Sequence, residues 1–385
     1  MTDSSLKKMW IGGQAVDGDA GVAPLVSVNP ATGEVNYEVA AAGAKAADTA
    51  VRVADEAARD KKWRNMLPPA RAAILSRIAD GMERRSEELA RLQMIENGKV
   101  WRECQTQVKS AAATFRYYAA VCETTGSEVT PARGDYLSMS VYEPYGVVAA
   151  ITPWNSPMTM EAQKVAPALA AGNAVILKPS EITPSTGLLL AEIAQEAGLP
   201  PGILNVLPGT GQQVGAALVE HPRVRMVSFT GGTESGRRIA ETAARKLMPV
   251  ALELGGKSPH IVFNDAPVDS AVAALAGGIF EGSGQSCVAG SRAFVQRGVY
   301  DEVVAKLSAV ARSLKVDLPD AAGAEMGPLA TFAHRDKVAA MVEAARAAGA
   351  DILAGGARPG SQALERGAYY LPTLIGGIDN HAAIA

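Results

Sequence analysis

The residue best suited to covalent chemistry in this 385-residue chain is Cys287, in the segment EGSGQSCVAGSR. Small residues and glycines surround it, so the backbone can present the thiol on a turn instead of burying it. A thiolate is the strongest nucleophile among ordinary side chains. A lone cysteine is also often a small buried hydrophobe, so spacing alone leaves both interpretations open. Cys104 and Cys122 lie in amphipathic helical patterns, which favours the buried interpretation for them.

Two polar residues could support such a nucleophile. Glu253 in ALELGGK ends a strand-like run and precedes two glycines, where a carboxylate could serve as a general base. Asn155 in ITPWNSP lies in a loop that two prolines restrict, where its amide could donate to a developing oxyanion. A solvated glutamate and an asparagine that binds its own backbone are the alternatives.

Glycine-rich segments could hold a phosphate. FTGGTESGRRIA and PGTGQQVG each follow a strand-like run and open a helix, so their backbone N–H groups could meet an anion. The segment KPSE, residues 178–181, adds a cation and a carboxylate suited to a nucleotide ribose. Neither glycine segment is a complete G-x-G-x-x-G, so a structural turn and a solvated ion pair stay open as alternatives.

The elements that must position these residues alternate between strand and helix. Apolar runs occur at 146–152, 173–178, 203–207 and 225–230, and helical patterns begin near Thr159, Pro184, Gln212 and Thr233. This order predicts βαβ units and a parallel, doubly wound sheet. The first third predicts mostly helix, over 41–60, from Pro69 and over 99–123, and YLSMSVYEPYG before residue 147 alternates as a strand does.

A second alternation begins near Leu254–Gly256. It predicts a helix over Val268–Phe280, a strand at RAFVQ, and helices over 299–313 and 331–348. Strands and helices in this order indicate a second α/β domain.

Composition excludes several function classes. Against 40 Asp and Glu stand 37 Lys and Arg, a net charge of −3 that offers no basic excess for nucleic acid. Three widely spaced cysteines exclude a disulfide framework and fit a reducing compartment. None of the four histidines has metal-ligand spacing, so no metal is expected. Without a signal peptide or a long apolar span, we expect a cytoplasmic protein with no membrane partner.

Taken in order, TPWN, GNAVILKPSE, FTGGTESG, ELGGKSP, GQSC and MGPLA closely resemble the aldehyde dehydrogenase superfamily over essentially the whole chain. The interval of 34 residues from Glu253 to Cys287 also matches the family. The resemblance implies oxidation of an aldehyde to a carboxylic acid in two steps. Cys287 attacks the carbonyl, and the Asn155 amide and the Cys287 N–H hold the oxyanion. After hydride transfer, Glu253 activates the water that hydrolyses the thioester.

The resemblance also implies a cofactor site. Lys178 and Glu181 are expected at the adenine ribose, where the carboxylate accepts from hydroxyls and repels a 2′-phosphate. NAD is therefore expected, with NADP as the alternative. Gly232 replaces a serine common in relatives, which removes one hydroxyl from the diphosphate site. The further cofactor positions are Thr152, Trp154, Gly211, Gly215, Phe229, Gly231, Gly232, Thr233, Gly236 and Leu254.

The substrate pocket departs from the common family pattern. Ser156 stands where an aromatic residue is frequent, and Gln163 replaces another aromatic residue of the tunnel that Met160 also lines. Both changes make the tunnel wider and more polar. We therefore expect a polar or bulky aldehyde rather than a small aliphatic one.

The resemblance assigns residues 1–122 and 147–253 to a Rossmann-like NAD-binding domain, 123–146 to a bridging hairpin used in oligomerisation, and 254–385 to the catalytic domain. Relatives continue past a PTL-type strand into an E-x-F-G-P segment, whereas here LPTLIGGIDNHAAIA stops before it. The catalytic domain is therefore expected to be incomplete at its C-terminus. The complete protein is expected to form a homodimer or homotetramer.

Two alternative functions remain. Coenzyme A-acylating and glutamyl-phosphate-reductase-like relatives generally lack the water-activating glutamate, so Glu253 argues against them. A nucleotide-binding homologue with impaired catalysis would follow from the expected missing segment. The presence of Cys287, Glu253 and Asn155 argues against that alternative.

Overall fold

The computed structural model describes residues 6–131 and 133–385. By its contacts the chain divides into two compact units. The first contains Met1–Val26, Tyr37–Ala90 and Gln105–Glu253, and the second contains Ser27–Asn36, Arg91–Cys104 and Leu254–Ala385. Two pieces of the first 122 residues thus fold with the second unit: the carbonyl of Pro30 accepts from Ala368 N at 2.7 Å, and Trp101 N donates to Pro319 O at 2.8 Å.

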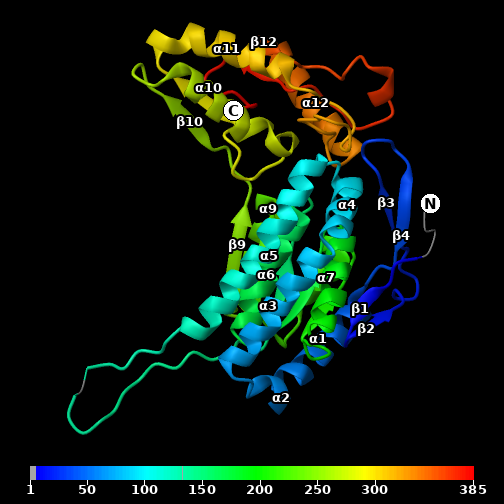
Figure 1. Ribbon diagram of the computed structural model, residues 1–385, viewed down its shortest axis with the longest axis vertical. Coiled ribbons are helices and arrows are strands. Elements are labelled where there is room, and N and C mark those ends of the chain that lie inside the picture. The colour runs from blue at the N-terminus through cyan, green and yellow to red at the C-terminus, as the bar shows by residue number, and fades with distance from the viewer. Residues whose placement is uncertain (1–5, 132) are drawn as a thin grey trace. The chain divides into compact units, whose positions relative to one another are not determined.

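A seven-stranded sheet forms the centre of the first unit, in the order β2-β1-β7-β6-β5-β8-β9. The labels β1, β2 and β9 mark three of its strands in Figure 1. The strands that carry the site are β5 (Val147–Ile151), β6 (Ala174–Lys178), β7 (Leu204–Val206), β8 (Val224–Gly231) and β9 (Val250–Leu254). The pairs β5–β6, β6–β7 and β5–β8 are parallel. Every residue of β5, β6 and β7 is buried, as in a sheet covered on both faces.

Two groups of helices cover this sheet. The first group is α3 (Pro68–Arg84), α6 (Pro157–Ala170) and α7 (Ser185–Glu196), and the second is α1 (Ala44–Arg59), α8 (Ala216–Glu220) and α9 (Thr233–Arg245). Helices α6 and α7 lead from β5 to β7, whereas α8 and α9 lead on to β8 and β9 on the other side of β5. The strand order therefore reverses between β5 and β8. This confirms the doubly wound α/β fold that the sequence predicts.

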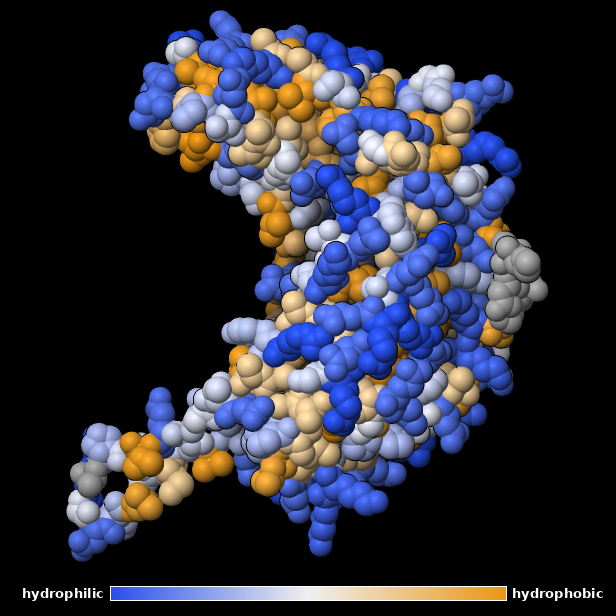
Figure 2. Space-filling view, in the orientation of Figure 1, coloured by the Kyte–Doolittle hydropathy of each residue, from blue (hydrophilic) through white to orange (hydrophobic). Residues whose placement is uncertain are grey.

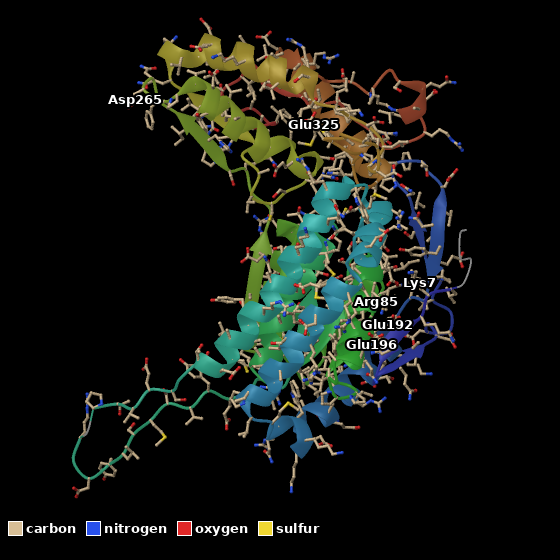
Figure 3. All side chains as sticks on the ribbon, viewed as in Figure 1. Lys7, Arg85, Glu192, Glu196, Asp265 and Glu325 are labelled. Carbon is tan, nitrogen blue, oxygen red and sulfur yellow. The ribbon has the colours of Figure 1, made fainter. Side chains whose placement is uncertain are left out.

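An ion-pair cluster links two helices of the first group. Arg85 follows α3, and its Nη1 lies 3.3 Å from Glu192 and 3.7 Å from Glu196, both on α7 (Figure 3). The arginine also forms an ion pair with Glu88 of α4 (Ser86–Asn97) at 2.8 Å. The cluster lies at the surface, so its contribution to stability is modest.

The helices predicted in the first third of the chain are confirmed as α1, α3 and α5 (Trp101–Thr124), but the sequence did not predict strands before them. From residue 6 onward, four strands precede α1: β1 (Met9–Ile11), β2 (Gln14–Val16), β3 (Leu25–Val28) and β4 (Val35–Val39). Strand β1 pairs antiparallel with β2 and, through Trp10 and Val206, with β7. Such short strands carry little periodicity of their own, and β1 is completed by a partner that is distant in sequence.

The prediction of a strand at YLSMSVYEPYG is wrong. The segment between α5 (Trp101–Thr124) and β5 is a hairpin, and its described residues form only an isolated bridge between Val129 and Met139. Thr130 N donates to Ser138 O at 2.9 Å, and Ser140 N donates to Glu128 O at 2.8 Å. No sheet edge pairs with this segment within the described part of the chain, so its alternating apolar residues remain exposed.

The second unit is also α/β. Strands β10 (Pro259–Val262) and β11 (Arg292–Val295) are parallel, and α10 (Val268–Phe280) and α11 (Tyr300–Ser313) share an apolar core with them. Helix α12 (Phe332–Ala347) packs on the antiparallel pair β12 (Asp351–Ala354) and β13 (Leu374–Gly376). The remaining helical elements are α2 (Lys61–Arg64), η1 (Gly211–Gly215), η2 (Glu281–Gly284), η3 (Arg297–Val299) and η4 (Gln362–Leu364). In the residues that the structure describes, no helix is long and apolar enough to cross a membrane.

Candidate active site

A cavity of about 630 Å³ lies at the carboxyl ends of the parallel strands of the first unit. Thr152 and Trp154 follow β5, Lys178 ends β6, and Phe229 and Gly231 belong to the end of β8. The cavity therefore occupies the point where the strand order reverses, which is where doubly wound sheets bind nucleotides. Its volume lies within the range of about 300–1,000 Å³ that is usual for small-molecule sites.

Most of the predicted cofactor residues line this cavity: Thr152, Trp154, Lys178, Glu181, Gly211, Gly215, Phe229, Gly231 and Gly232. Thr233 is the first residue of α9 and Gly236 is buried within it, whereas Leu254 begins the second unit. Sequence reasoning missed several lining residues, including Thr210, Gln212, Glu220, Arg238 and Thr242. Thr210 and Gln212 flank Gly211 in the turn after β7, and that position in the chain was the available signal. Glu220 ends α8, and Arg238 and Thr242 lie within α9, where the sequence carried no such signal.

Lys178 and Glu181 form the polar pair of the cavity. The Lys178 side chain is only 3% exposed, and its ammonium lies 3.4 Å from a carboxylate oxygen of Glu181, whose side chain is 46% exposed. Burial lowers the pKa of Lys178, and the neighbouring Glu181 acts in the opposite direction. The pair thus offers a donor and an acceptor to the hydroxyls of a ribose.

Two helix starts face the cavity. Gly231 and Gly232 lead into α9, and Gly211 opens the π-helical turn η1, whose cap Thr210 accepts from Gln213 N at 3.2 Å. Free N–H groups at a helix start bind anions such as phosphate. A Cβ on Gly231 would lie 2.5 Å from the Phe229 ring, so a side chain at this position would displace that ring.

Two buried hydroxyls in the cavity wall support a fit to a nucleotide. The Oγ1 atoms of Thr152 and Thr230 have no hydrogen-bond partner in the structure, although both residues line the cavity. A buried hydroxyl without a partner is costly, so such groups are commonly satisfied by a ligand or by water. Together with Glu181 and the two helix starts, these residues fit a dinucleotide.

Cys287 is exposed, whereas Cys104 and Cys122 are buried. Burial raises the pKa of Cys104 to about 12, which keeps that thiol protonated at neutral pH. Cys287 lies on a turn between η2 and β11 that Gln285 anchors: Gln285 Oε1 accepts from Ala330 N at 3.0 Å, and its Nε2 donates to Gly282 O at 3.3 Å. The cysteine suited to nucleophilic attack is therefore the accessible one.

Glu253 is exposed on β9, and a buried lysine lies near it. Lys164 of α6 is 7% exposed, and its Nζ donates to Ser228 Oγ of β8 at 3.1 Å. Burial lowers the pKa of Lys164 to about 8, while the Glu253 carboxylate acts to raise it. Sequence reasoning missed Lys164, because a lysine within a helical pattern carries no sign of burial.

Asn155 is half-buried in the loop that leads from β5 into α6. The next residue, Ser156, accepts a hydrogen bond from Gln107 Nε2 of α5 at 3.0 Å. Met160 is half-buried and Gln163 is exposed. The structure therefore brings Ser156 together with Gln107, which sequence reasoning did not single out.

Asn155 and Glu253 belong to the first unit and Cys287 to the second.

Nowhere in residues 6–131 and 133–385 do three or more His, Cys, Asp or Glu side chains gather so that they could hold a metal ion.

Comparison with known proteins identifies the family. The Aldehyde dehydrogenase family matches residues 16–385. The chain is 39% identical over 369 residues to (Z)-2-((N-methylformamido)methylene)-5-hydroxybutyrolactone dehydrogenase of Acinetobacter baylyi, covering 96% of this chain and 74% of that protein. It is 41% identical over 366 residues to 3,6-anhydro-alpha-L-galactose dehydrogenase of Streptomyces coelicolor, covering 94% of this chain and 72% of that protein.

The fold agrees with a solved structure of this kind. The NAD+ complex of aldehyde dehydrogenase from Bacillus cereus matches with a TM-score of 0.95 and 36% identity, over 99% of this chain and 77% of that one. These matches agree with two features of the structure: the cavity where the strand order reverses, and the exposed thiol of Cys287. The chain therefore belongs to the aldehyde dehydrogenase family and is an oxidoreductase that acts on aldehydes.

Proposed function

We propose that the chain oxidises an aldehyde to its carboxylic acid with NAD, through a thioester on Cys287. The Cys287 thiolate attacks the carbonyl carbon, and the oxyanion accepts hydrogen bonds from the Asn155 amide and the Cys287 N–H. NAD, when bound, accepts the hydride. Glu253 then takes a proton from water, the hydroxide adds to the thioester, and the Cys287 thiolate leaves as the acid is released. The exposed thiol of Cys287 within the GQSC motif carries this proposal.

The residues that hold the cofactor are those of the cavity. Glu181 accepts from the ribose hydroxyls, and the starts of α9 and η1 bind the diphosphate through backbone N–H groups. A carboxylate at Glu181 repels a 2′-phosphate, which favours NAD over NADP. The solved relative from Bacillus cereus in complex with NAD+ supports this choice.

Single-turnover kinetics test the assigned roles. With NAD and an aldehyde, we expect Cys287→Ser to form no NADH, while calorimetry shows that NAD binding is retained. Glu253→Gln is expected to form about one NADH per active site and then stall, because only the hydrolysis step loses its base. Asn155→Ala is expected to slow the first NADH by about 10²–10³-fold, the usual cost of one oxyanion donor.

The matched control is Cys122→Ala, which removes a buried thiol of α5 and should leave the NADH burst unchanged. NADH formation by Cys287→Ser would refute the assigned nucleophile. Full steady-state turnover by Glu253→Gln would refute the assigned base.

For the substrate, we propose a polar, oxygen-bearing aldehyde rather than a small aliphatic one. The serine at position 156 and its hydrogen bond to Gln107 place polar groups next to Asn155. Both curated relatives named above act, by their names, on oxygen-rich substrates: a hydroxybutyrolactone derivative and an anhydro sugar. A panel in which acetaldehyde or hexanal gave the highest kcat/KM would contradict this proposal.

For the assembly, we propose a homodimer or homotetramer in which the hairpin between α5 and β5 contributes. Its exposed apolar side chains support this role. The free thiol of Cys287 needs a reducing environment, so the cytoplasm is the compartment we propose.

A further inference from the structure

The imidazole of His260 lies between two glycines of the second unit. His260 is on β10, Gly278 is on α10, and Gly290 follows the turn that carries Cys287. A Cβ on Gly278 would lie 2.8 Å from both Cε1 and Nε2 of the ring. A Cβ on Gly290 would overlap ring atoms Cδ2 and Nε2. The ring therefore fills the space that a side chain at either glycine would need.

Gly278 and Gly290 are explained by the space that a side chain would occupy, and not by a backbone conformation that only glycine can adopt. Neither Gly278 nor Gly290 has a positive φ, so an alanine could adopt either backbone conformation. Glycine inside a helix costs about 1 kcal/mol relative to alanine, which makes Gly278 unfavourable for α10 by itself. Contact with the imidazole ring is the feature of the structure that disfavours a side chain at both positions, because a Cβ at either one would displace the ring or the backbone.

A short loop with several backbone hydrogen bonds connects Gly290, which contacts the His260 ring, to Cys287. Gly290 is three residues after Cys287, and its N–H donates to Gly278 O at 3.1 Å. Within the loop, Ala289 N donates to Ser286 O at 3.2 Å and Ser291 N donates to Ala289 O at 2.9 Å. A shift of Gly290 away from α10 would therefore carry Cys287 with it.

We propose that His260 is a positioning residue for the nucleophile: its ring, held between Gly278 and Gly290, sets the separation between α10 and the loop that bears Cys287. The proposal rests on the role of Cys287 in the proposed function. The ring acts by its volume, as a wedge between the helix and the loop, and takes no part in proton transfer.

A double-mutant cycle tests the wedge. Gly290→Ala forces a methyl against the ring, so we expect the rate of the NADH burst to fall at least about ten-fold, since small misplacements of reacting groups cost this much or more. His260→Ala alone should lower the burst rate less. In His260→Ala/Gly290→Ala the methyl occupies the vacated space, so the burst rate should recover at least about three-fold over Gly290→Ala.

Alkylation of Cys287 by iodoacetamide, followed by peptide mass spectrometry, provides a readout that does not depend on turnover. We expect its rate to follow the same order: slowest in Gly290→Ala and partly restored in the double variant. Gly277→Ala is the matched control, because no atom lies within 4 Å of a Cβ at that neighbouring position of α10. It should leave both rates unchanged, whereas Gly278→Ala should lower them.

The proposal is overturned if Gly290→Ala matches the wild type in both rates, or if the double variant is no better than Gly290→Ala. If Gly290→Ala yields no folded protein, the double variant should restore folding, and its failure to do so would equally contradict the wedge. A lower Tm with an unchanged alkylation rate would show that the ring only stabilises the fold. An active Cys287→Ser would instead refute the proposed function, and the alkylation series would still decide the role of His260.

Discussion

At the scale of single residues, Lys164 is a buried charged side chain, and its burial lowers the stability of the folded state. The residue is 7% exposed, its ammonium donates to one serine hydroxyl, and burial lowers its pKa from 10.5 to about 8. A buried lysine destabilises the folded state as long as both the folded and the unfolded chain keep the proton, that is, below about pH 8. Above that pH the folded chain releases the proton first, so this penalty is relieved up to about pH 10.5.

We therefore expect Lys164→Met to stabilise the protein by about 1–3 kcal/mol at pH 7. The variant should have the higher Tm at pH 7, and its advantage should shrink between pH 8 and pH 10 because only the wild type gains stability there. Scanning calorimetry across this pH range measures the difference. Lys306→Met, which changes a lysine whose side chain is 40% exposed and forms a surface ion pair with Asp269, is the control and should show no comparable gain at pH 7. A destabilised Lys164→Met would show that the ammonium contributes more than its burial costs.

At the scale of elements, α5 and α6 meet through a polar link beside Asn155. Gln107 of α5 donates to Ser156 Oγ at the start of α6, and the other amide atom, Gln107 Oε1, is buried without a hydrogen-bond partner. Thr159, in the first turn of α6, also has a buried hydroxyl without a hydrogen-bond partner. Sites built with polar groups disfavour analogues that leave those groups unpaired.

The link predicts a change in specificity. We expect Gln107→Leu to lower kcat/KM for hydroxylated aldehydes such as glycolaldehyde by about ten-fold or more, while kcat/KM for acetaldehyde changes little. Gln105→Leu changes an exposed glutamine of the same helix and should alter neither value. Equal losses for both aldehydes would mean that Gln107 acts on the fold and not on the choice of substrate.

At the scale of the whole molecule, the hairpin between α5 and β5 extends from the first unit with little cover. Figure 2 shows apolar side chains along it, and Leu137 and Val141 are 75% and 66% exposed. Exposed apolar side chains on an extended segment with few backbone partners favour association with another chain.

We expect the wild-type chain to elute as a dimer or larger assembly in size-exclusion chromatography with light scattering. Leu137→Asp/Val141→Asp should shift this equilibrium towards monomer, because two charges would be buried at the contact. Leu67→Asp is the control, since Leu67 is 71% exposed but lies at the start of α3. A hairpin variant with the same assembly as the wild type would remove the hairpin from the interface.

The sequence by itself determined the central strands and most helices of both α/β units, and nine of the twelve predicted cofactor residues line the cavity. Strand, turn and helix signals are local, and each glycine-rich segment carries its own strand end and helix start. The fold class and the family followed from them, and the fold and the comparisons confirm both. The roles of Cys287, Glu253 and Asn155 also came from motifs, and they remain predictions for the kinetics above to test.

Only the tertiary structure decided the features that join distant parts of the chain. The pairing of Trp10 with Val206, the burial of Lys164 and the position of the His260 ring between two glycines each depend on partners far away in sequence. The strand predicted at YLSMSVYEPYG within the hairpin was wrong for the same reason, since an alternating segment becomes a strand only where another strand edge can pair with it. Local propensity decides whether a segment becomes a helix or a strand. Contacts between elements decide which strands pair and which side chains become buried.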